Sequence, residues 1–130
     1  MKTKTYFSEF ANGQNKDIAV GIITKDDSRY ETLKPLFEQY GFGFTDTKIG
    51  CVFIDGESGL SEAELKWVEA HEVAHINLKH KMGDRNDEDE LEADQFAKLY
   101  LWKYGYKESV NLIDKHLKER HKRKYYETNN

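Results

Sequence analysis

Apolar residues in the first half of the chain are grouped in short segments that are typical of β-strands. The segments Lys4–Phe10 and Asp17–Thr24 flank Asn12-Gly13, a dipeptide that tolerates positive φ and is common in hairpins. Residues 18–23 are mostly apolar and rich in β-branched side chains, as in a buried strand. Lys48–Asp55 has a similar composition and leads into a glycine-rich turn. The pattern therefore predicts a small N-terminal sheet.

A short helix is expected between these strands, at about Leu33–Tyr40. Pro35 should lie in its first turn, because a proline further inside a helix removes a backbone hydrogen bond. Gly41 follows Tyr40, and glycine often ends a helix because it accepts positive φ. The helix should therefore stop at Gly41.

The second half of the chain is predicted to be helical. Ser61 and Glu64 have the spacing of a capping box, and no Gly or Pro occurs from there to His80. A second helix is expected at about Asp87–Tyr104, where the acidic start suits the positive end of the helix dipole. A third is expected at about Lys107–Arg123. Two C-terminal helices should thus follow the first long one.

The composition is that of a single globular domain. The 130 residues include 20 Lys+Arg and 24 Asp+Glu, and the net charge of −4 disfavours nucleic acid as the main partner. The single cysteine excludes an intrachain disulfide, and no apolar run suggests a signal peptide or a membrane span. We expect a cytoplasmic α+β domain over residues 1–124, without membrane contact, and a disordered tail over 125–130.

The segment His71-Glu72-Val73-Ala74-His75 has the spacing His-Glu-x-x-His and lies within the first long helix. Residues four apart share a helix face, so both imidazoles can point at one metal ion. Glu72 lies about 100° further round the helix, where it can take a proton from an attacking water. The pattern predicts a zinc site with His71 and His75 as ligands and Glu72 as the general base.

A catalytic zinc ion also needs a third protein ligand, and the second long helix offers Glu90. Glu90 and Asp94 are four residues apart, so Glu90 can bind the metal while Asp94 accepts a hydrogen bond from a ligand histidine. Acidic residues are dense in this segment, and Glu88 and Glu92 are alternative ligands. The expected cofactor is one Zn²⁺ per chain.

The two segments His71–His75 and Glu90–Ala97 together resemble the paired motifs of the gluzincin zinc metallopeptidases. The stretch from Glu64 to His80 is similar to the HtpX-like and CAAX-prenyl-protease branch. Phe96-Ala97, after the acidic motif, resembles the soluble ImmA/IrrE-type branch. The short length of the chain suggests a minimal member of the family, like the minigluzincins.

This resemblance implies a zinc-dependent endopeptidase with a zincin-like fold, in which a small antiparallel or mixed sheet packs on the active-site helix. It assigns Glu90 as the third ligand and Asp94 as the support of the first ligand histidine. It also implies that the edge strand of the sheet binds an extended polypeptide substrate. Lys48–Asp55 is the expected edge strand. Its substrate-binding residues would be Cys51, Val52 and Phe53.

Two other functions remain open at this point. The chain could be a latent or noncatalytic zinc-binding protein that acts by protein binding, with its cleft covered by its own C-terminal segment. It could also be a nucleic-acid-binding accessory protein with a structural zinc, because Lys115–Lys124 is rich in basic residues. A peptidase further needs a group that stabilises the oxyanion. The candidates for that role are Tyr100, Tyr104, Tyr106 and His116.

Overall fold

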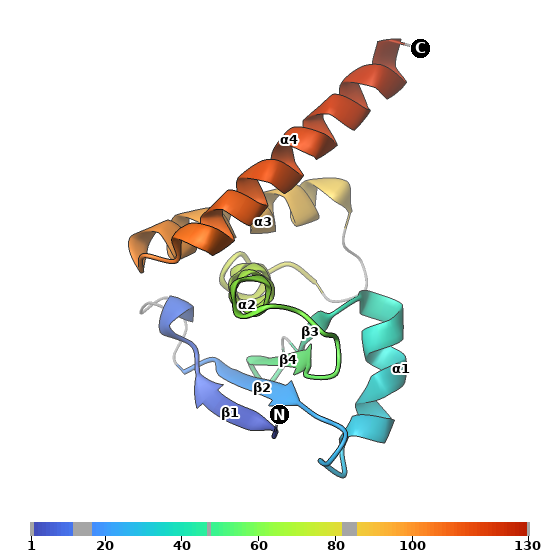
Figure 1. Ribbon diagram of the computed structural model, residues 1–130, viewed down its shortest axis with the longest axis vertical. Helices are drawn as coiled ribbons and strands as arrows, with labels where there is room; N and C mark the ends of the chain where they lie inside the picture. Colours follow the sequence, from blue (N-terminus) through green and yellow to red (C-terminus); the bar gives the residue numbers. More distant parts are fainter. Residues whose placement is uncertain (1, 12–16, 47, 82–85, 130) are drawn as a thin grey trace.

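The computed structural model describes residues 2–11, 17–46, 48–81 and 86–129, with side chains as far as residue 120. Within these ranges the chain forms an α+β fold with a mixed four-stranded sheet and four α-helices. Figure 1 shows three layers, in which α2 lies between the sheet and the pair α3 and α4. The elements are β1 (Lys4–Phe7), a 3₁₀ turn η1 (Glu9–Ala11), β2 (Ala19–Ile23), α1 (Tyr30–Tyr40), β3 (Gly43–Asp46), β4 (Cys51–Asp55), α2 (Glu62–Asn77), α3 (Asp87–Lys103) and α4 (Lys107–Asn129).

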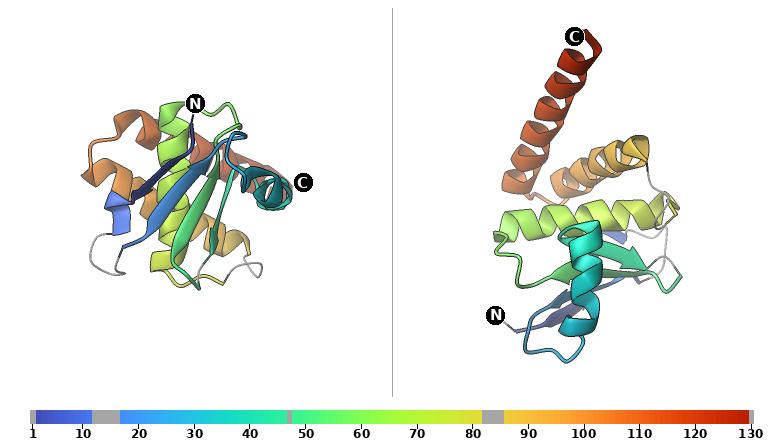
Figure 2. Two further views of the ribbon diagram at one scale, coloured as in Figure 1. Left: turned by 90° about the horizontal axis from the view of Figure 1, so that it is seen from below. Right: turned by 90° about the vertical axis from the view of Figure 1, so that its right-hand side faces the viewer.

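The strand order in the sheet is β1-β2-β4-β3 (Figure 2). β1 and β2 are antiparallel neighbours, as expected for the predicted hairpin, although Asn12-Gly13 itself lies outside the described residues. β2 and β4 are parallel, and β3 pairs antiparallel with β4. Because β1 and β3 form the two outer strands, the sheet is open on both sides within the described part of the chain.

The prediction that Lys48–Asp55 forms the edge strand was wrong. β4 starts at Cys51 and is paired on both sides: Val52 lies opposite Val20 of β2 and opposite Thr45 of β3. Cys51, Val52 and Phe53 therefore belong to an inner strand, where the backbone groups that would pair with a substrate are engaged in the sheet. The edge beside β4 is β3, a segment that the apolar pattern did not identify.

β3 lies very close to α2. A Cβ atom on Gly43 would be 2.7 Å from Val68 Cγ1 and 3.1 Å from the backbone oxygen of Phe53. A side chain at this position would force the strand away from the helix, so glycine permits the contact. The absence of a side chain at Gly43 is therefore one reason why this edge can lie against α2.

Two helix boundaries differ from the expectation. α1 starts at Tyr30, so Pro35 lies in its second turn instead of its first. Gly41 does end α1, with φ of 95° and its N–H donated to Phe37 O. α4 continues to Asn129, beyond the predicted end at Arg123, since no Gly or Pro follows to stop it. The segment expected to be a tail is thus helical as far as Asn129.

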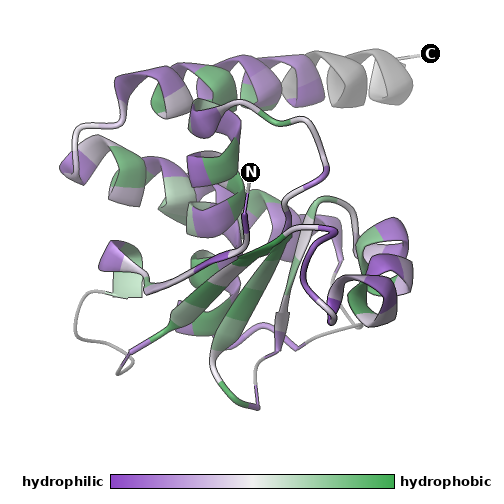
Figure 3. Ribbon diagram, turned by 60° about the horizontal axis from the view of Figure 1, so that its bottom comes forward, coloured by the Kyte–Doolittle hydropathy of each residue, from purple (hydrophilic) through white to green (hydrophobic). Residues whose placement is uncertain are grey.

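The apolar core joins the sheet to α2 and continues from α2 to α3 and α4. Figure 3 shows the hydrophobic residues concentrated on the strands and on the inner parts of the helices. Each layer contributes a fully buried side chain. Examples are Ile54 of β4, Val73 of α2, Leu101 of α3 and Ile113 of α4. No helix in the described part of the chain has the length and apolar character needed to cross a membrane.

Candidate metal centre

α2 positions both histidines of the motif. It starts at the predicted capping box, in which Ser61 Oγ accepts from the Glu64 N–H and the Glu64 carboxylate accepts from the Ser61 N–H. One helical turn separates His71 from His75, and their Nε2 atoms lie 3.0 Å apart. His75 is fully buried, whereas the His71 side chain keeps 17% of its surface exposed. The pair therefore faces inward at one point on α2.

α3 brings a carboxylate to the same point. Glu90 Oε2 lies 2.8 Å from His71 Nε2, and Glu90 Oε1 lies 3.4 Å from His75 Nε2. Among the described residues, these three side chains form a group whose donor atoms all lie within 4.8 Å of one another. Glu88 and Glu92, the alternative third ligands, are not members of this group. The structure thus selects Glu90 from the acidic segment.

The spacing of the three donors can accept a metal ion. Tetrahedral zinc with ligand bonds of about 2.0–2.1 Å places neighbouring donors about 3.3 Å apart. The separations here are 2.8, 3.0 and 3.4 Å, so small side-chain movements bring all three to bonding distance. Two imidazole nitrogens with one carboxylate are also a donor set found in catalytic zinc sites, where a fourth position stays open.

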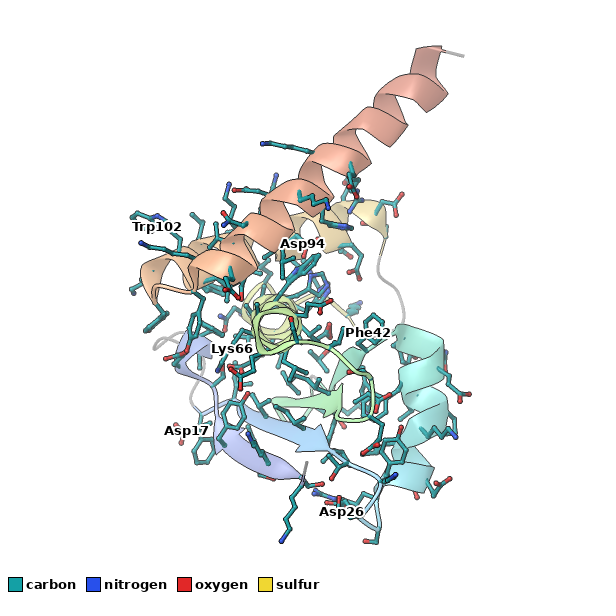
Figure 4. All side chains as sticks on the ribbon, in the orientation of Figure 1. Asp17, Asp26, Phe42, Lys66, Asp94 and Trp102 are labelled. Carbon is teal, nitrogen blue, oxygen red and sulfur yellow. The ribbon has the colours of Figure 1, made fainter. Side chains whose placement is uncertain are left out.

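Asp94, on α3, links the ligand group to Trp67 of α2 and to one further helix, α4. Its Oδ1 accepts hydrogen bonds from His71 Nδ1–H, at 2.8 Å, and from Trp67 Nε1–H, at 2.9 Å. His116 Nε2, from α4, lies 3.5 Å from Asp94 Oδ2. The structure therefore places Asp94 at the outer nitrogen of His71, which leaves His71 Nε2 for a metal. In Figure 4, Asp94 lies between α2 and the outer helices.

His80 lies outside the ligand group, but it contacts the second histidine. His80 Nδ1 is 2.9 Å from His75 Nδ1, and His80 Nε2 is 2.8 Å from Glu92 Oε1. The only sequence signal for the contact between the two histidines is that His80 follows His75 by five residues, a spacing that brings two side chains together at the end of a helix only if the chain turns sharply there.

A cavity of about 560 Å³ opens beside the ligand group. It is bounded by the end of α1 and the start of β3 on one side, and by α2, α3 and α4 on the other. Glu72 lines it and is nearly buried, with Oε2 3.9 Å from His71 Nε2. The apolar part of the wall consists of Tyr40, Phe42, Leu60, Trp67 and Val68. Phe42 is labelled in Figure 4, on the side of α1.

α4 contributes two basic side chains to the cavity wall, His116 and Arg120. Arg120 Nη2 donates a hydrogen bond to the backbone oxygen of Asp87, at 2.7 Å, and so ties α4 to the start of α3. His116 was an oxyanion candidate from the sequence, whereas Arg120 appeared there only as part of the basic stretch Lys115–Lys124. Their spacing of four residues, which places both on one helix face, is the signal that would have paired them.

The tyrosine candidates for oxyanion stabilisation lie elsewhere. Tyr100, Tyr104 and Tyr106 surround Phe10, with ring centroids 5.7 to 6.3 Å from it. Tyr106 also donates a hydrogen bond to Glu9. None of the three lines the cavity beside the ligand group. His116 is thus the candidate from that set that the structure places near the site.

The charges around the site favour a bound cation or proton. Burial by itself lowers the pKa of His71, but hydrogen bonds to Asp94 and Glu90 and the charge of Glu72 outweigh it, and the pKa of His71 rises to about 10. The hydrogen bond from His71, with His75 also close by, holds the pKa of Glu90 well below its usual range. The metal-free group therefore binds a proton tightly where a metal ion would otherwise provide the positive charge.

Comparison with protein-family models, curated proteins and solved structures gives no match to this chain. The functional conclusions therefore rest on the residues and the geometry described above.

Proposed function

We propose that the protein is a small zinc-dependent endopeptidase of the gluzincin type, with a zincin-like fold. The observation that carries this proposal is the convergence of His71, His75 and Glu90 beside a cavity that Glu72 also lines. α2 supplies His71, Glu72 and His75, and α3 supplies Glu90. Each residue occupies the motif position that the proposed chemistry requires. One Zn²⁺ per chain would be held by the two Nε2 atoms and the Glu90 carboxylate.

The side chains have distinct tasks in this proposal. Zinc, when bound, supplies Lewis acidity that polarises a carbonyl and makes water a stronger nucleophile. Glu72 takes the proton of the attacking water and passes it to the leaving amine. Asp94 fixes the His71 ring through its outer nitrogen. His116, which also lines the cavity, would donate a hydrogen bond to the oxyanion.

The substrate in this proposal is an extended polypeptide that adds to the sheet at β3 instead of β4. β3 is the outer strand next to the site, and Gly43, its first residue, lines the cavity. A peptide laid along this edge would gain backbone hydrogen bonds and tolerate many sequences. Substrates carrying N-methyl groups on the amides around the scissile bond should therefore lose kcat/KM, while cleavage elsewhere in the same peptide is retained.

The test of the peptidase proposal compares the zinc-loaded parent with Glu72→Gln on an unfolded protein and on a peptide library. We expect new peptide termini from the parent, detected by mass spectrometry. Glu72→Gln should lower the rate by about 10²–10⁴-fold, the usual contribution of a general base, while its zinc content stays that of the parent. Equal cleavage by the two proteins would mean that the activity does not come from this site.

A latent zinc protein is the second candidate function, and one observation favours it. α4 carries His116 and Arg120 into the cavity wall, and Arg120 bonds the first residue of α3 across that side. The C-terminal helix could therefore restrict access to the site. In that case Arg120→Ala, which removes the contact to Asp87, should cleave peptides that the parent chain does not. Equal activity of Arg120→Ala and the parent would argue against latency.

A further inference from the structure

The two proposed ligand histidines are held by different kinds of partner. The outer nitrogen of His71 faces the carboxylate of Asp94, the usual type of support for a metal-binding histidine. The outer nitrogen of His75 faces a second imidazole, His80, at 2.9 Å. A carboxylate can only accept a hydrogen bond, whereas a neutral imidazole can accept or donate. The position of the proton on His75 therefore depends on the hydrogen-bond partners of His80.

The backbone at the end of α2 is built to bring His80 onto His75. His80 N–H donates to His75 O and Lys79 N–H donates to Ile76 O, which is the hydrogen-bond pattern of a Schellman motif. Lys79 has φ of 59°, in the left-handed region where glycine is usual. In this motif the residue after the left-handed position contacts the residue three places before the helix cap. Here that contact, usually apolar, joins two histidines.

The carboxylate of Glu92 sets the direction of the hydrogen bonds that join it to His80 and His80 to His75. Glu92 Oε1, at 2.8 Å from His80 Nε2, must accept, so His80 carries its proton on Nε2. Asp89 Oδ1, 3.5 Å from the same nitrogen, acts in the same sense. His80 Nδ1 is then an acceptor, and His75 must donate from Nδ1. This leaves the lone pair on His75 Nε2, which faces His71 and Glu90.

We propose that His80 and Glu92 are positioning residues for the second metal ligand, because together they hold His75 in the tautomer whose Nε2 can bind the ion. The inference rests on the proposed zinc centre and adds a role for two residues outside it. It also gives Glu92 a function that differs from the one considered in the sequence analysis. Glu92 acts on the metal through His80, and does not bind the metal itself.

The experiment measures zinc affinity by competition with a chromophoric chelator, and the absorption spectrum of the Co²⁺-loaded protein. His80→Ala and Glu92→Ala should weaken zinc binding by about 10–100-fold, as is common when the partner of a ligand histidine is removed. His80→Asn should recover part of the loss, because its amide oxygen can accept from His75 Nδ1–H. The Co²⁺ spectrum of the two alanine variants should shift as the His75 ring reorients.

Glu88→Ala is the matched control. Glu88 carries the same charge, is exposed and lies one turn before Glu92 on the same face of α3. Its removal should change zinc affinity by no more than about twofold, since exposed charges are screened by solvent and salt. Equal losses of zinc affinity in Glu88→Ala and Glu92→Ala would mean that only the overall negative charge of α3 matters, and this result would overturn the proposal.

The remaining outcomes separate this inference from the proposed function. A His80→Ala variant with parental circular dichroism and parental zinc affinity overturns the inference. If that variant does not fold, Glu92→Ala decides alone, because Glu92 is on the surface. A parent that binds zinc but cleaves no peptide contradicts the peptidase proposal and leaves the support of His75 to be judged by affinity. A parent that binds no zinc overturns both.

Discussion

Glu69 and Glu72, three residues apart on α2, are both buried but have very different surroundings. Glu69 faces the side of β1 and η1, where it accepts hydrogen bonds from Tyr6, Ser8 and Lys66. Glu72 is turned by about 60° round the helix from Glu69, and it lines the cavity next to the proposed ligand group. Figure 4 shows Lys66, a partner of Glu69, on one flank of α2, and Asp94 above the helix.

The comparison shows that the role of a buried carboxylate depends on what faces it. The three donors of Glu69 come from two elements far apart in sequence, and the Lys66 ammonium also lies over the rings of Tyr6 and Tyr106 at 5.2 and 5.3 Å. This arrangement satisfies a buried charge and stabilises the contact between α2 and β1. Glu72 instead adjoins open volume and a group of metal donors, which suits chemistry on a bound molecule.

The largest expected effect is the loss of metal on the Glu72 side of α2. His75→Ala removes a buried ligand of the proposed ion, so stoichiometric zinc binding should disappear. Glu69→Gln, the control at the carboxylate that faces Tyr6 and Ser8, should bind one zinc per chain like the parent. Elemental analysis after desalting measures both. If Glu69→Gln also lost its zinc, the two sides of α2 would not be independent.

The next largest effect is on stability, on the Glu69 side. Glu69→Ala leaves Tyr6, Ser8 and Lys66 without their shared acceptor, and the free energy of unfolding should fall by about 3 kcal/mol. Urea denaturation of the zinc-loaded protein measures the loss. Glu72→Gln serves as the control and should cost much less than Glu69→Ala. A larger loss in Glu72→Gln would reverse the structural roles assigned to the two carboxylates.

A third effect, on pH dependence, is expected for the metal-free protein. The pKa of His71 is about 10 in the folded chain, against about 6.5 when unfolded, so the folded state holds the extra proton between these values. The stability contributed by this proton is complete below pH 6.5 and is lost as the pH rises through 10. The slope is at most about 1.4 kcal/mol per pH unit.

Urea denaturation in the presence of a chelator, repeated at several pH values from 6.5 to 10, measures this slope. His71→Gln has no titrating group at this position and should show a flatter profile over the same range. Parallel profiles for the parent and His71→Gln would contradict the assignment. Zinc should also bind more tightly as the pH rises in this range, because it displaces the same proton.

The smallest effect concerns the turn that brings His80 to His75. Lys79 has a left-handed backbone, so Lys79→Gly should raise the free energy of unfolding by about 0.5–1 kcal/mol. Zinc affinity should stay at the parental value, since the Schellman hydrogen bonds are backbone contacts. Thermal denaturation of the metal-free chain is the measurement. A destabilised Lys79→Gly would mean that the Lys79 side chain contributes more than its backbone strain costs.

The sequence by itself determined what depends on residues close together in the chain. The capping box at Ser61 and Glu64 places the start of α2, and the spacing of four places His71 and His75 on one face. Gly41 ends α1 through its positive φ. These features depend on local hydrogen bonds and on helical geometry, which do not change with the surroundings.

Only the tertiary structure decided the rest. Whether Glu88, Glu90 or Glu92 meets the histidines depends on how α3 is rotated against α2, which is set by the packing of buried residues such as Ala97 and Leu101. The strand order, with β4 inside and β3 at the edge, depends on pairing between segments distant in the chain. Such pairings are chosen by the burial of whole surfaces, and no local pattern records that choice.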